Sequence, residues 1–394
     1  MNYVLFDDPG HEQLLPLTLT RPVADIRIGI LSIREKWEKF LGASTSTLTR
    51  DYLSKKFSLE TSKDMMLING SVLPTIALLN EINKLAMNES LVQPGIIIAR
   101  RIMADDLDIV LNSDEAKFVN ITFPHPVIKI NKPWDIFSIN AEAIRSDFEL
   151  LTSGKKSQEL EPSNTVIGEG AIFIEKNAKV QGAILNTNNG PIYIGEDAEV
   201  MEGSTIRGPF ALCKHSTVKM GAKIYGPTTI GPHSKVGGEL NNVVIFGYSN
   251  KAHDGFIGNS VIGEWCNIGA DTNSSNLKNT YEEVRVWSYE KERFTKTGLQ
   301  FCGLIMGDHS KCGINTMFNT GTVVGVSANI FGAGFQRNFI KSFSWGGTHG
   351  MTEYNIDKAI KVARIVYGRR EMEFTEEDEN IFRYIHNISL AENI

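Results

Sequence analysis

Aliphatic residues recur every six positions through the centre of the chain. The uninterrupted run consists of Ile194, Val200, Ile206, Leu212, Val218, Ile224, Ile230 and Val236. Small side chains precede most of them by two positions, at Ala198, Ser204, Ser216, Ala222, Thr228 and Ser234, with Phe210 as the exception. A period of six fits neither an amphipathic helix nor an alternating strand. It predicts short strands wound into a solenoid, each pointing one aliphatic residue inward.

The period continues on both sides of this run. It extends backwards through Val180 and Ile174 if two residues near Asn186–Gly190 are looped out. Forwards, it predicts inward positions at Val244, Asn250, Phe256, Ile262 and Ile268, then at Met306, Cys312, Phe318, Val324 and Ile330. Such hexapeptide repeats resemble the left-handed parallel β-helix, a three-sided prism. Residues 164–347 are therefore expected to form this β-helix.

One long segment interrupts the repeat. Residues 271–299 are too many for an ordinary corner between two short strands. Within them, Val284–Tyr289 and Phe294–Thr295 flank a charged stretch, which predicts a β-hairpin. A hairpin here is expected to contact a neighbouring subunit or to cover a site.

The flanking regions have different patterns. Residues 1–155 alternate short apolar runs with helical stretches, which predicts an α/β domain with a largely parallel sheet. The expected strands are Tyr3–Phe6, Met65–Ile68 and Gly95–Ala99, and the expected helices are Ile30–Leu41 and Thr75–Met87. Residues 352–394 are polar with a helical apolar stripe, and they are expected to cap the open end of the solenoid.

Composition narrows the possible partners and compartments. The net charge is −6 and no dense basic stripe occurs, which argues against nucleic-acid binding. No apolar run approaches about 18 residues, so no membrane span is expected. The four cysteines, which lack a CxxC pair, are interpreted as buried free thiols: Cys213, Cys266, Cys302 and Cys312. A cytoplasmic protein is the simplest interpretation.

A stretch of the repeat resembles a known enzyme family. The segment from His253 to Asn276 is similar to the acetyltransferase domain of bifunctional N-acetylglucosamine-1-phosphate uridyltransferases, which carry H-x-x-[YF]-[IL]-G-x-x-x-I-G-x-x-x-N-I-G-A-G-T-x-x-x-N. Eleven positions match without a gap: His253, Ile257, Gly258, Ile262, Gly263, Asn267, Ile268, Gly269, Ala270, Thr272 and Asn276. Asp271 and Phe256 stand where the family has Gly and commonly Tyr.

The resemblance implies acetyl transfer from acetyl-CoA to an amino-sugar phosphate. His253 would be the general base, since imidazole accepts a proton near neutral pH, although a histidine at a corner is otherwise an ordinary polar residue. Asn276 and Asn267 would contact substrate, and Lys278 would meet a phosphate. His309, near a corner after the insertion, is a weaker candidate for the donor site. Active sites of similar acyltransferases lie between neighbouring prisms, which implies a homotrimer.

The N-terminal region resembles sugar-1-phosphate nucleotidyltransferases. Leu14–Trp37 is similar to their first loop and helix, and together with the prism it indicates a GlmU-like architecture. That resemblance implies a nucleoside triphosphate and Mg²⁺, with Arg21 and Arg27 as phosphate-binding residues. Two motif elements depart from the family. The Gly-rich phosphate turn is missing, and Ser71 replaces the metal-binding Asp. Asp7 or Asp8 is an alternative metal ligand.

Three hypotheses therefore follow. The first is a transferase of sugar-nucleotide precursor synthesis that acetylates an amino-sugar phosphate, with a motif-degraded nucleotidyltransferase domain. The second is an active sugar-1-phosphate nucleotidyltransferase whose β-helix is regulatory. The third is a non-catalytic scaffold that binds sugar nucleotides. The missing glycine turn favours the third over the second for the N-terminal domain, and the His253 motif favours the first over the third for the β-helix.

Overall fold

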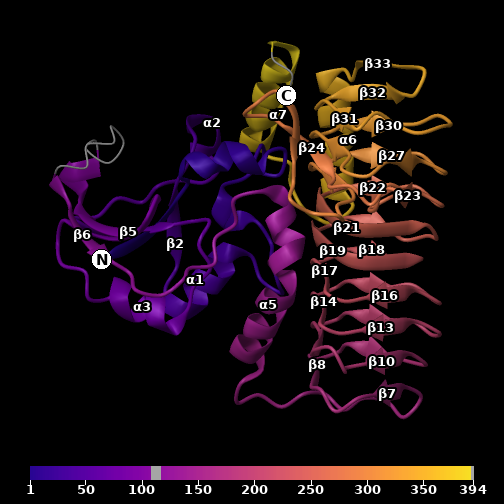
Figure 1. Ribbon diagram of the computed structural model, residues 1–394, viewed down its shortest axis with the longest axis horizontal. Coiled ribbons are helices and arrows are strands. Elements are labelled where there is room, and N and C mark those ends of the chain that lie inside the picture. Colours follow the sequence, from indigo (N-terminus) through magenta and orange to yellow (C-terminus); the bar gives the residue numbers. More distant parts are fainter. Residues whose placement is uncertain (108–116, 392–394) are drawn as a thin grey trace. The chain divides into compact units, whose positions relative to one another are not determined.

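The computed structural model describes residues 1–107 and 117–391 (Figure 1). By packing, the chain forms two compact units. The first holds Met1–Leu14, Thr20–Ile26 and Leu31–Asn131. The second holds Leu15–Leu19, Arg27–Ile30 and the residues from Lys132 onward. The sequence placed the first domain boundary after residue 155, whereas the helix that follows Lys132 packs with the second unit.

The first unit contains a six-stranded sheet in the order β2-β1-β3-β5-β4-β6. Its strands are β1 (Asn2–Phe6), β2 (Thr45–Leu48), β3 (Asp64–Asn69), β4 (Glu89–Gln93), β5 (Ile96–Met103) and β6 (Val119–Thr122). The sheet is mixed rather than largely parallel, because β5 runs antiparallel to both of its neighbours. A two-residue turn joins β4 to β5, and so short a connection allows only an antiparallel pair.

Helices and short helical turns complete the first unit. They are η1 (Pro9–Leu14), η2 (Val23–Asp25), α1 (Ile33–Leu41), α2 (Asp51–Ser54), α3 (Ile76–Ile82) and η3 (Ala104–Asp106). The expected helices are confirmed at α1 and α3, but both begin later than predicted, after the capping residues Ser32 and Thr75. The Ser32 hydroxyl accepts the Glu35 N–H while Glu35 accepts the Ser32 N–H, which fixes the start of α1.

The second unit is a three-sided parallel β-helix, and its strands stack as regular rungs in Figure 1. The first face contains β7 (Thr165–Ile167), β10 (Ile184–Asn186), β13 (Thr205–Arg207), β16 (Lys223–Tyr225), β23 (Asn273–Ser274), β28 (Met317–Phe318) and the first halves of β19 (Glu239–Gly247) and β21 (Phe256–Glu264). The second face contains the other halves of β19 and β21 with β8 (Ile172–Ile174), β11 (Ile192–Ile194), β14 (Phe210–Leu212), β17 (Thr228–Ile230), β26 (Ile305–Met306), β29 (Val323–Val324) and β31 (Phe339–Ile340).

The third face is the longest of the three. It contains β9 (Lys179–Val180), β12 (Glu199–Val200), β15 (Thr217–Val218), β18 (Lys235–Val236), β20 (Asn250–Lys251), β22 (Asn267–Ile268), β27 (Lys311–Cys312), β30 (Asn329–Ile330), β32 (Ser344–Gly347) and β33 (Gly350–Glu353). The last strand runs antiparallel to β32, so this hairpin covers the edge of the face.

The uninterrupted hexad run is confirmed as the core of the β-helix. Every member from Ile194 to Val236 is buried in one continuous cluster, and the small residues two positions earlier are buried as well. Register fixes the turn length: Ile206 pairs with Ile224, eighteen residues later. Three hexads therefore make one turn, and each hexad supplies one face.

Beyond Val236 the predicted phase is wrong by one residue at three positions. The inward residues are Ile245, Lys251 and Ile257, where the repeat predicted Val244, Asn250 and Phe256. Leu240 pairs with Ile224 only sixteen residues away. The turns shorten here because β19 and β21 pass through a corner as continuous strands, on the stretch that helix α5 (Pro133–Thr152) packs against.

Helix α5 holds the N-terminal segment Arg27–Ile30 to the β-helix. The Asn140 Oδ1 atom accepts the Gly29 N–H at 2.8 Å, and Asp147 Oδ2 accepts the Ile30 N–H at 2.7 Å. Thr229 on β17 donates to the Gly29 carbonyl at 2.9 Å. A side chain at Gly29, whose φ is +75°, would lie 2.5 Å from Asp147, so only glycine fits.

Stacked rings occupy one corner of the β-helix. His215, His233, Tyr248, Trp265 and His309 all have positive φ, and we call them the ring ladder. Tyr248 stacks on Trp265 with ring centroids 4.2 Å apart, and His233 stacks on Tyr248 at 4.9 Å. Non-glycine residues rarely take this conformation, so ring stacking compensates for its cost.

The C-terminal helices α6 (Ile356–Gly368) and α7 (Glu376–Ala391) pack against this ring ladder. Tyr367 of α6 stacks on Trp265 with centroids 4.1 Å apart, and Phe382 of α7 meets His309 edge-on at 4.9 Å. The sequence placed these helices over the open end of the solenoid. They instead lie along its side, because the rings of this corner offer an apolar surface to cover. Residues 392–394 lie outside the described residues.

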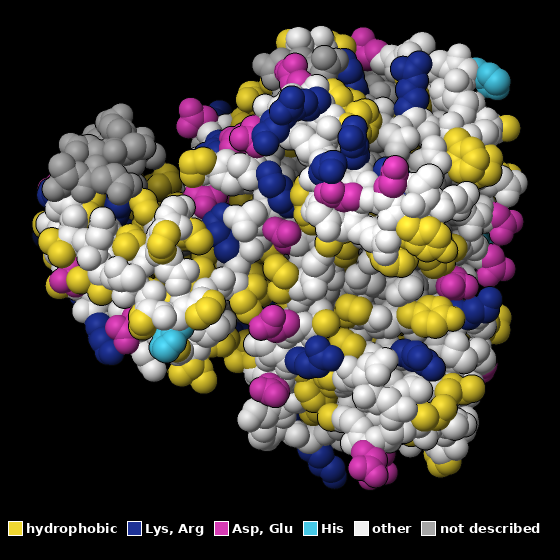
Figure 2. Space-filling view, viewed as in Figure 1, with side chains coloured by type: hydrophobic (Ala, Val, Ile, Leu, Met, Phe, Trp, Pro, Cys, Tyr) yellow, Lys and Arg dark blue, Asp and Glu magenta, His cyan; other side chains and the backbone are white. Residues whose placement is uncertain are grey.

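Among the described residues, no helix is long and apolar enough to cross a membrane. The four cysteines are buried free thiols, as expected. On the face shown in Figure 2, Lys and Arg side chains are interspersed with Asp and Glu.

Candidate functional site

The acetyltransferase-like segment places His253 at an exposed corner of the β-helix, directly after β20. A buried side chain inside the β-helix forms hydrogen bonds with the backbone of this corner. Lys251, which points into the core, donates from Nζ to the His253 carbonyl at 2.6 Å and to the Asp254 carbonyl at 3.1 Å. The imidazole is therefore presented to solvent on a fixed backbone, as a base that must meet a substrate requires.

Sequence reasoning missed Lys251. Its side chain is 1% exposed and occupies an inward position in register with Val236, where every other strand of this part of the face has an apolar residue. Burial lowers the pKa of the Lys251 ammonium to about 8. Lys251 lies two residues before the matched His253. The sequence would have predicted it as an inward residue only if the phase change after Val236 had been recognised.

Asn276 belongs to a column of asparagines on the next corner. Its Nδ2 donates to Asn259 Oδ1 at 2.7 Å. With the Asn242 amide oriented to satisfy its neighbours, Asn259 Nδ2 donates to Asn242 Oδ1 at 3.0 Å and Asn242 donates to the Phe137 carbonyl at 2.8 Å. The three residues are seventeen positions apart, which is one turn here. Asn242 and Asn259 were missed because their repeat differs from the eighteen-residue turn of the main run.

The chain does not bring the predicted β-helix residues together in one place. His253 and Asn276 lie on two corners separated by the strand residues Phe256–Gly258. Asn267 is exposed on the third face, in register with Asn250.

His309 is 5% exposed and lies within the ring ladder. Tyr367, Phe374 and Phe382 of the C-terminal segment surround its ring, with centroids 4.9–6.2 Å away. These contacts place the imidazole inside packed aromatic side chains rather than toward an open donor site.

Lys278 lies in the long insertion, and the predicted hairpin is confirmed as β24 (Arg285–Ser288) paired with β25 (Arg293–Lys296). The Lys278 Nζ donates to the Glu283 carbonyl at 3.0 Å. A cavity of about 590 Å³ opens beside the hairpin, and its lining comprises Lys278, Arg285, Trp287, Phe294, Thr320, Arg337, Asn338 and Phe339.

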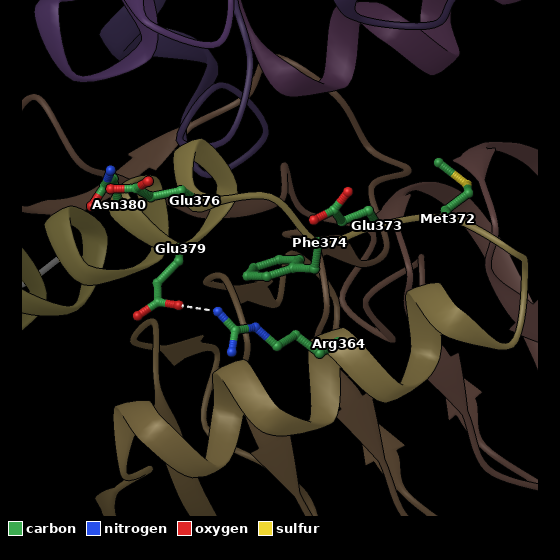
Figure 3. A pocket seen from close by; sticks show the side chains of 7 residues that line it. All are labelled: Arg364, Met372, Glu373, Phe374, Glu376, Glu379 and Asn380. Atoms are coloured by element: carbon green, nitrogen blue, oxygen red, sulfur yellow. Dashed lines mark hydrogen bonds and ion pairs between the residues drawn. The ribbon is translucent and has the colours of Figure 1, made fainter.

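A second cavity, of about 690 Å³, lies between α6 and α7 (Figure 3). Glu373, Glu376 and Glu379 line it, and Glu379 forms an ion pair with Arg364 at 2.5 Å. Its acidic lining disfavours a phosphorylated ligand. None of the predicted site residues lines it.

In the first unit, polar residues gather after β1 and β3, where the adjacent parallel strands end together. Asp7 accepts hydrogen bonds from the Val23 N–H at 2.8 Å and the Thr49 hydroxyl at 2.5 Å. Burial raises the pKa of its carboxyl to about 6. Asp8 accepts from Gly10 N at 2.8 Å and Asn69 Nδ2 at 3.0 Å.

These contacts bear on the expected magnesium site. Asp8 Oδ2 also lies 3.2 Å from Lys129 Nζ, so a cation already sits against it. Ser71 supplies no carboxylate here, and its hydroxyl donates to Asn69 Oδ1 at 2.6 Å. No group of three potential metal ligands occurs among the described residues. Mg²⁺ is commonly held by one or two carboxylates, and Asp8 could bind it only by giving up its contact with Lys129.

The two predicted phosphate-binding arginines belong to different units. Arg21 is 6% exposed in the first unit. Arg27 lies in a segment of the second unit, where its Nε donates to the Phe246 carbonyl at 3.0 Å and its Nη1 donates to the Ile30 carbonyl. The contacts of Arg27 tie its segment to β19.

Comparisons with known proteins agree with this architecture. Residues 3–156 match the family of sugar nucleotidyl transferases. The chain is 31% identical over 204 residues to the bifunctional sugar-1-phosphate nucleotidylyltransferase/acetyltransferase of Sulfurisphaera tokodaii, covering 51% of this chain and 44% of that protein. It is 34% identical over 87 residues to the bifunctional protein GlmU of Methanococcus aeolicus, covering 22% of this chain and 20% of that protein.

The chain thus spans less than half the length of the curated relatives it matches. One solved structure, of the polySia-specific acetyltransferase NeuO, is 16% identical with a TM-score of 0.29, and the match covers 54% of this chain and 99% of that one. The match of residues 3–156 to sugar nucleotidyl transferases and the similarity to two bifunctional proteins, one of them named GlmU, agree with a nucleotidyl transferase-like domain ahead of the β-helix.

Proposed function

We propose that this chain is a transferase of sugar-nucleotide precursor synthesis, whose β-helix acetylates an amino-sugar phosphate from acetyl-CoA. The observation that carries the proposal is the corner at His253, where an exposed imidazole stands on a backbone held by buried Lys251. The relatives that are named as both nucleotidylyltransferases and acetyltransferases support the reaction class. The proposed compartment is the cytoplasm, where free thiols like these four persist.

In the proposed reaction, His253 removes a proton from the amine as its nitrogen attacks the thioester carbonyl. The bond from nitrogen to the acetyl carbon forms, and the carbon–sulfur bond breaks to release the thiol of coenzyme A. Imidazole is the side chain that most often serves as a general base, and its ring nitrogen can accept that proton. Asn276 and Asn267 are proposed to contact substrate, and Lys278 to contact a phosphate.

An acceptor panel tests this proposal directly. The full chain is incubated with acetyl-CoA and a set of amino-sugar 1-phosphates and 6-phosphates, and thiol release is measured. We expect one phosphorylated amino sugar to be acetylated, and the matching sugar without an amine to be inert. No thiol release with any member of the panel would leave the scaffold hypothesis as the better account.

We also propose a homotrimer, because His253 and Asn276 lie on different corners of one chain. A neighbouring prism can place its own corner against His253 and so complete the site. Light scattering of the dilute, active protein is expected to give three chains per particle. An active monomer would contradict a site shared between subunits.

For the N-terminal domain we expect weak or undetectable nucleotidyl transfer. The glycine turn is missing, Ser71 stands in place of a metal-binding Asp, and Lys129 already contacts Asp8 at 3.2 Å. Pyrophosphate release from UTP or dTTP with sugar 1-phosphates and Mg²⁺ measures this. Rapid release that Arg21→Ala abolishes would show that this domain uses a different loop, and would favour the active nucleotidyltransferase with a regulatory β-helix.

A further inference from the structure

The cavity beside the β24–β25 hairpin has a strongly basic lining. Of its eight residues, Lys278, Arg285 and Arg337 are cationic and none is acidic. The whole chain has a net charge of −6, so this lining departs from the average of the protein. A concentration of positive charge in a concave surface attracts anionic ligands.

The two arginines of the cavity have no counter-ion among the described residues. The side chains of Arg285 and Arg337 are exposed, and neither makes a hydrogen bond or ion pair with the residues that the structure describes. Other arginines of this protein are paired with carboxylates at short range, such as Arg34 with Asp25 at 2.6 Å and Arg101 with Asp64 at 2.8 Å. Two unpaired guanidinium groups on one cavity provide planar donors suited to a phosphate.

Three aromatic rings form the other part of the lining. Trp287 stacks on Phe339 with ring centroids 4.4 Å apart and planes 11° apart. Phe294 meets Trp287 edge-on at 5.4 Å, and Phe294 remains 41% exposed. Exposed or half-buried rings beside cations are a surface on which a flat heteroaromatic ring can stack.

The cavity is built into the fold. Val284 precedes β24 and Val286 lies within it, and their side chains are 0% and 1% exposed. Asn338 Nδ2 donates to the Thr320 carbonyl at 2.8 Å and so ties the two corner segments of the lining. Gly321, with φ of +65°, lets the chain approach the Arg285 carbonyl, where a Cβ would lie at 2.3 Å. A site held by such contacts binds without first paying the entropy of ordering its walls.

We propose that this hairpin cavity binds a phosphorylated nucleotide. Arg285 and Arg337 would contact its phosphate groups, and Trp287 and Phe294 would contact its base. A volume of about 590 Å³ is within the range of small-molecule sites. If the ligand is the nucleotide end of an acyl-CoA, the inference rests on the proposed function and adds the site that holds the donor, beside Lys278. Both the nucleotide end of an acyl-CoA and a sugar nucleotide carry this chemistry.

Direct binding to the full chain tests the proposal without any turnover. Calorimetric titrations use ADP and UDP as the minimal nucleotides, and adenosine and inorganic pyrophosphate as their separate parts. Saturable binding of a nucleoside diphosphate is expected, with both separate parts binding more weakly. Coenzyme A and UDP-N-acetylglucosamine then distinguish the two sources, since the tighter of the two identifies the natural ligand class.

Variants locate the bound nucleotide. Arg285→Gln and Arg337→Gln are each expected to weaken binding by about tenfold to a hundredfold, the range for losing one hydrogen bond to a charged group. Arg293→Gln is the matched control, since Arg293 is an exposed arginine of the same hairpin that does not line the cavity. Thermal unfolding checks that each variant folds.

Three results would overturn the proposal. They are no saturable binding of any nucleotide, binding that Arg285→Gln and Arg337→Gln leave unchanged, and an equal loss in Arg293→Gln. A protein that binds nucleotide here but acetylates nothing would refute only the proposed function. A protein that acetylates but has no nucleotide bound at this cavity would refute only the present inference.

Discussion

Acetyl transfer is expected to fall by roughly 10²–10⁴-fold when His253 is replaced by alanine, the usual range for loss of a general base. The loss should appear mainly in kcat, because the imidazole accepts the proton in the transition state and contributes less to substrate binding in the ground state. Steady-state rates of thiol release against both substrates separate kcat from KM. The side chain is exposed, so the fold and the oligomeric state should be unchanged.

Two further variants make the result specific to proton transfer. His253→Asn keeps similar size and polarity but cannot accept a proton at neutral pH, and it should be nearly as inactive as His253→Ala. His349→Ala removes another exposed histidine and should retain full activity. Full activity of His253→Ala would mean that the segment is similar to acetyltransferases in architecture alone. Asn276→Ala should instead weaken the binding of one substrate, measured as a raised KM.

Stability is expected to depend on alkaline pH through Lys251. Its pKa is lowered to about 8 in the folded chain, against an unfolded value near 10.5. Between these values the unfolded state binds more protons, so the free energy of unfolding rises with pH across this window, by about 3 kcal/mol in total. Below about pH 8 both states are protonated, and the gain is absent. Lys251→Met removes the titrating group and should flatten this rise, as measured by denaturant unfolding at pH 7.5 and pH 10.

The matched control is Lys223→Met, which removes an exposed lysine from β16 and should keep the wild-type pH dependence. Lys251→Met should also lower acetyl transfer without removing the base, because the carbonyls of His253 and Asp254 lose their internal donor. An unchanged alkaline slope in Lys251→Met would contradict the assignment of the proton to this residue.

The core of the β-helix follows directly from the sequence. From Val200 to Val236 each hexad except the one with Phe210 combines an inward aliphatic residue with a buried small residue. Each strand pairs with the strand one turn away, so every inward residue has similar surroundings. The local sequence pattern is therefore sufficient to predict which residues point inward. The hairpin in the insertion was predictable for the same reason, since its two short runs pair with each other across a turn.

Only tertiary structure decided where that regularity changes. Helix α5 packs on β17, β19 and β21, and there the turn shortens from eighteen residues to as few as fifteen. This change moves Lys251 into the core and aligns Asn242, Asn259 and Asn276 as one column. The six-residue repeat alone does not predict this shorter turn, because the length of a corner depends on the helix that packs against it.

The same limit applies to the chemistry. The sequence alone determined the β-helix, its insertion and His253 as a candidate base, since these rest on local pattern and motif. Tertiary structure decided that His309 is enclosed by Tyr367 and Phe382, that Arg27 donates to the β19 backbone, and that Arg285 and Arg337 line one cavity. Each of these depends on contacts between segments far apart in the chain, which no periodicity encodes.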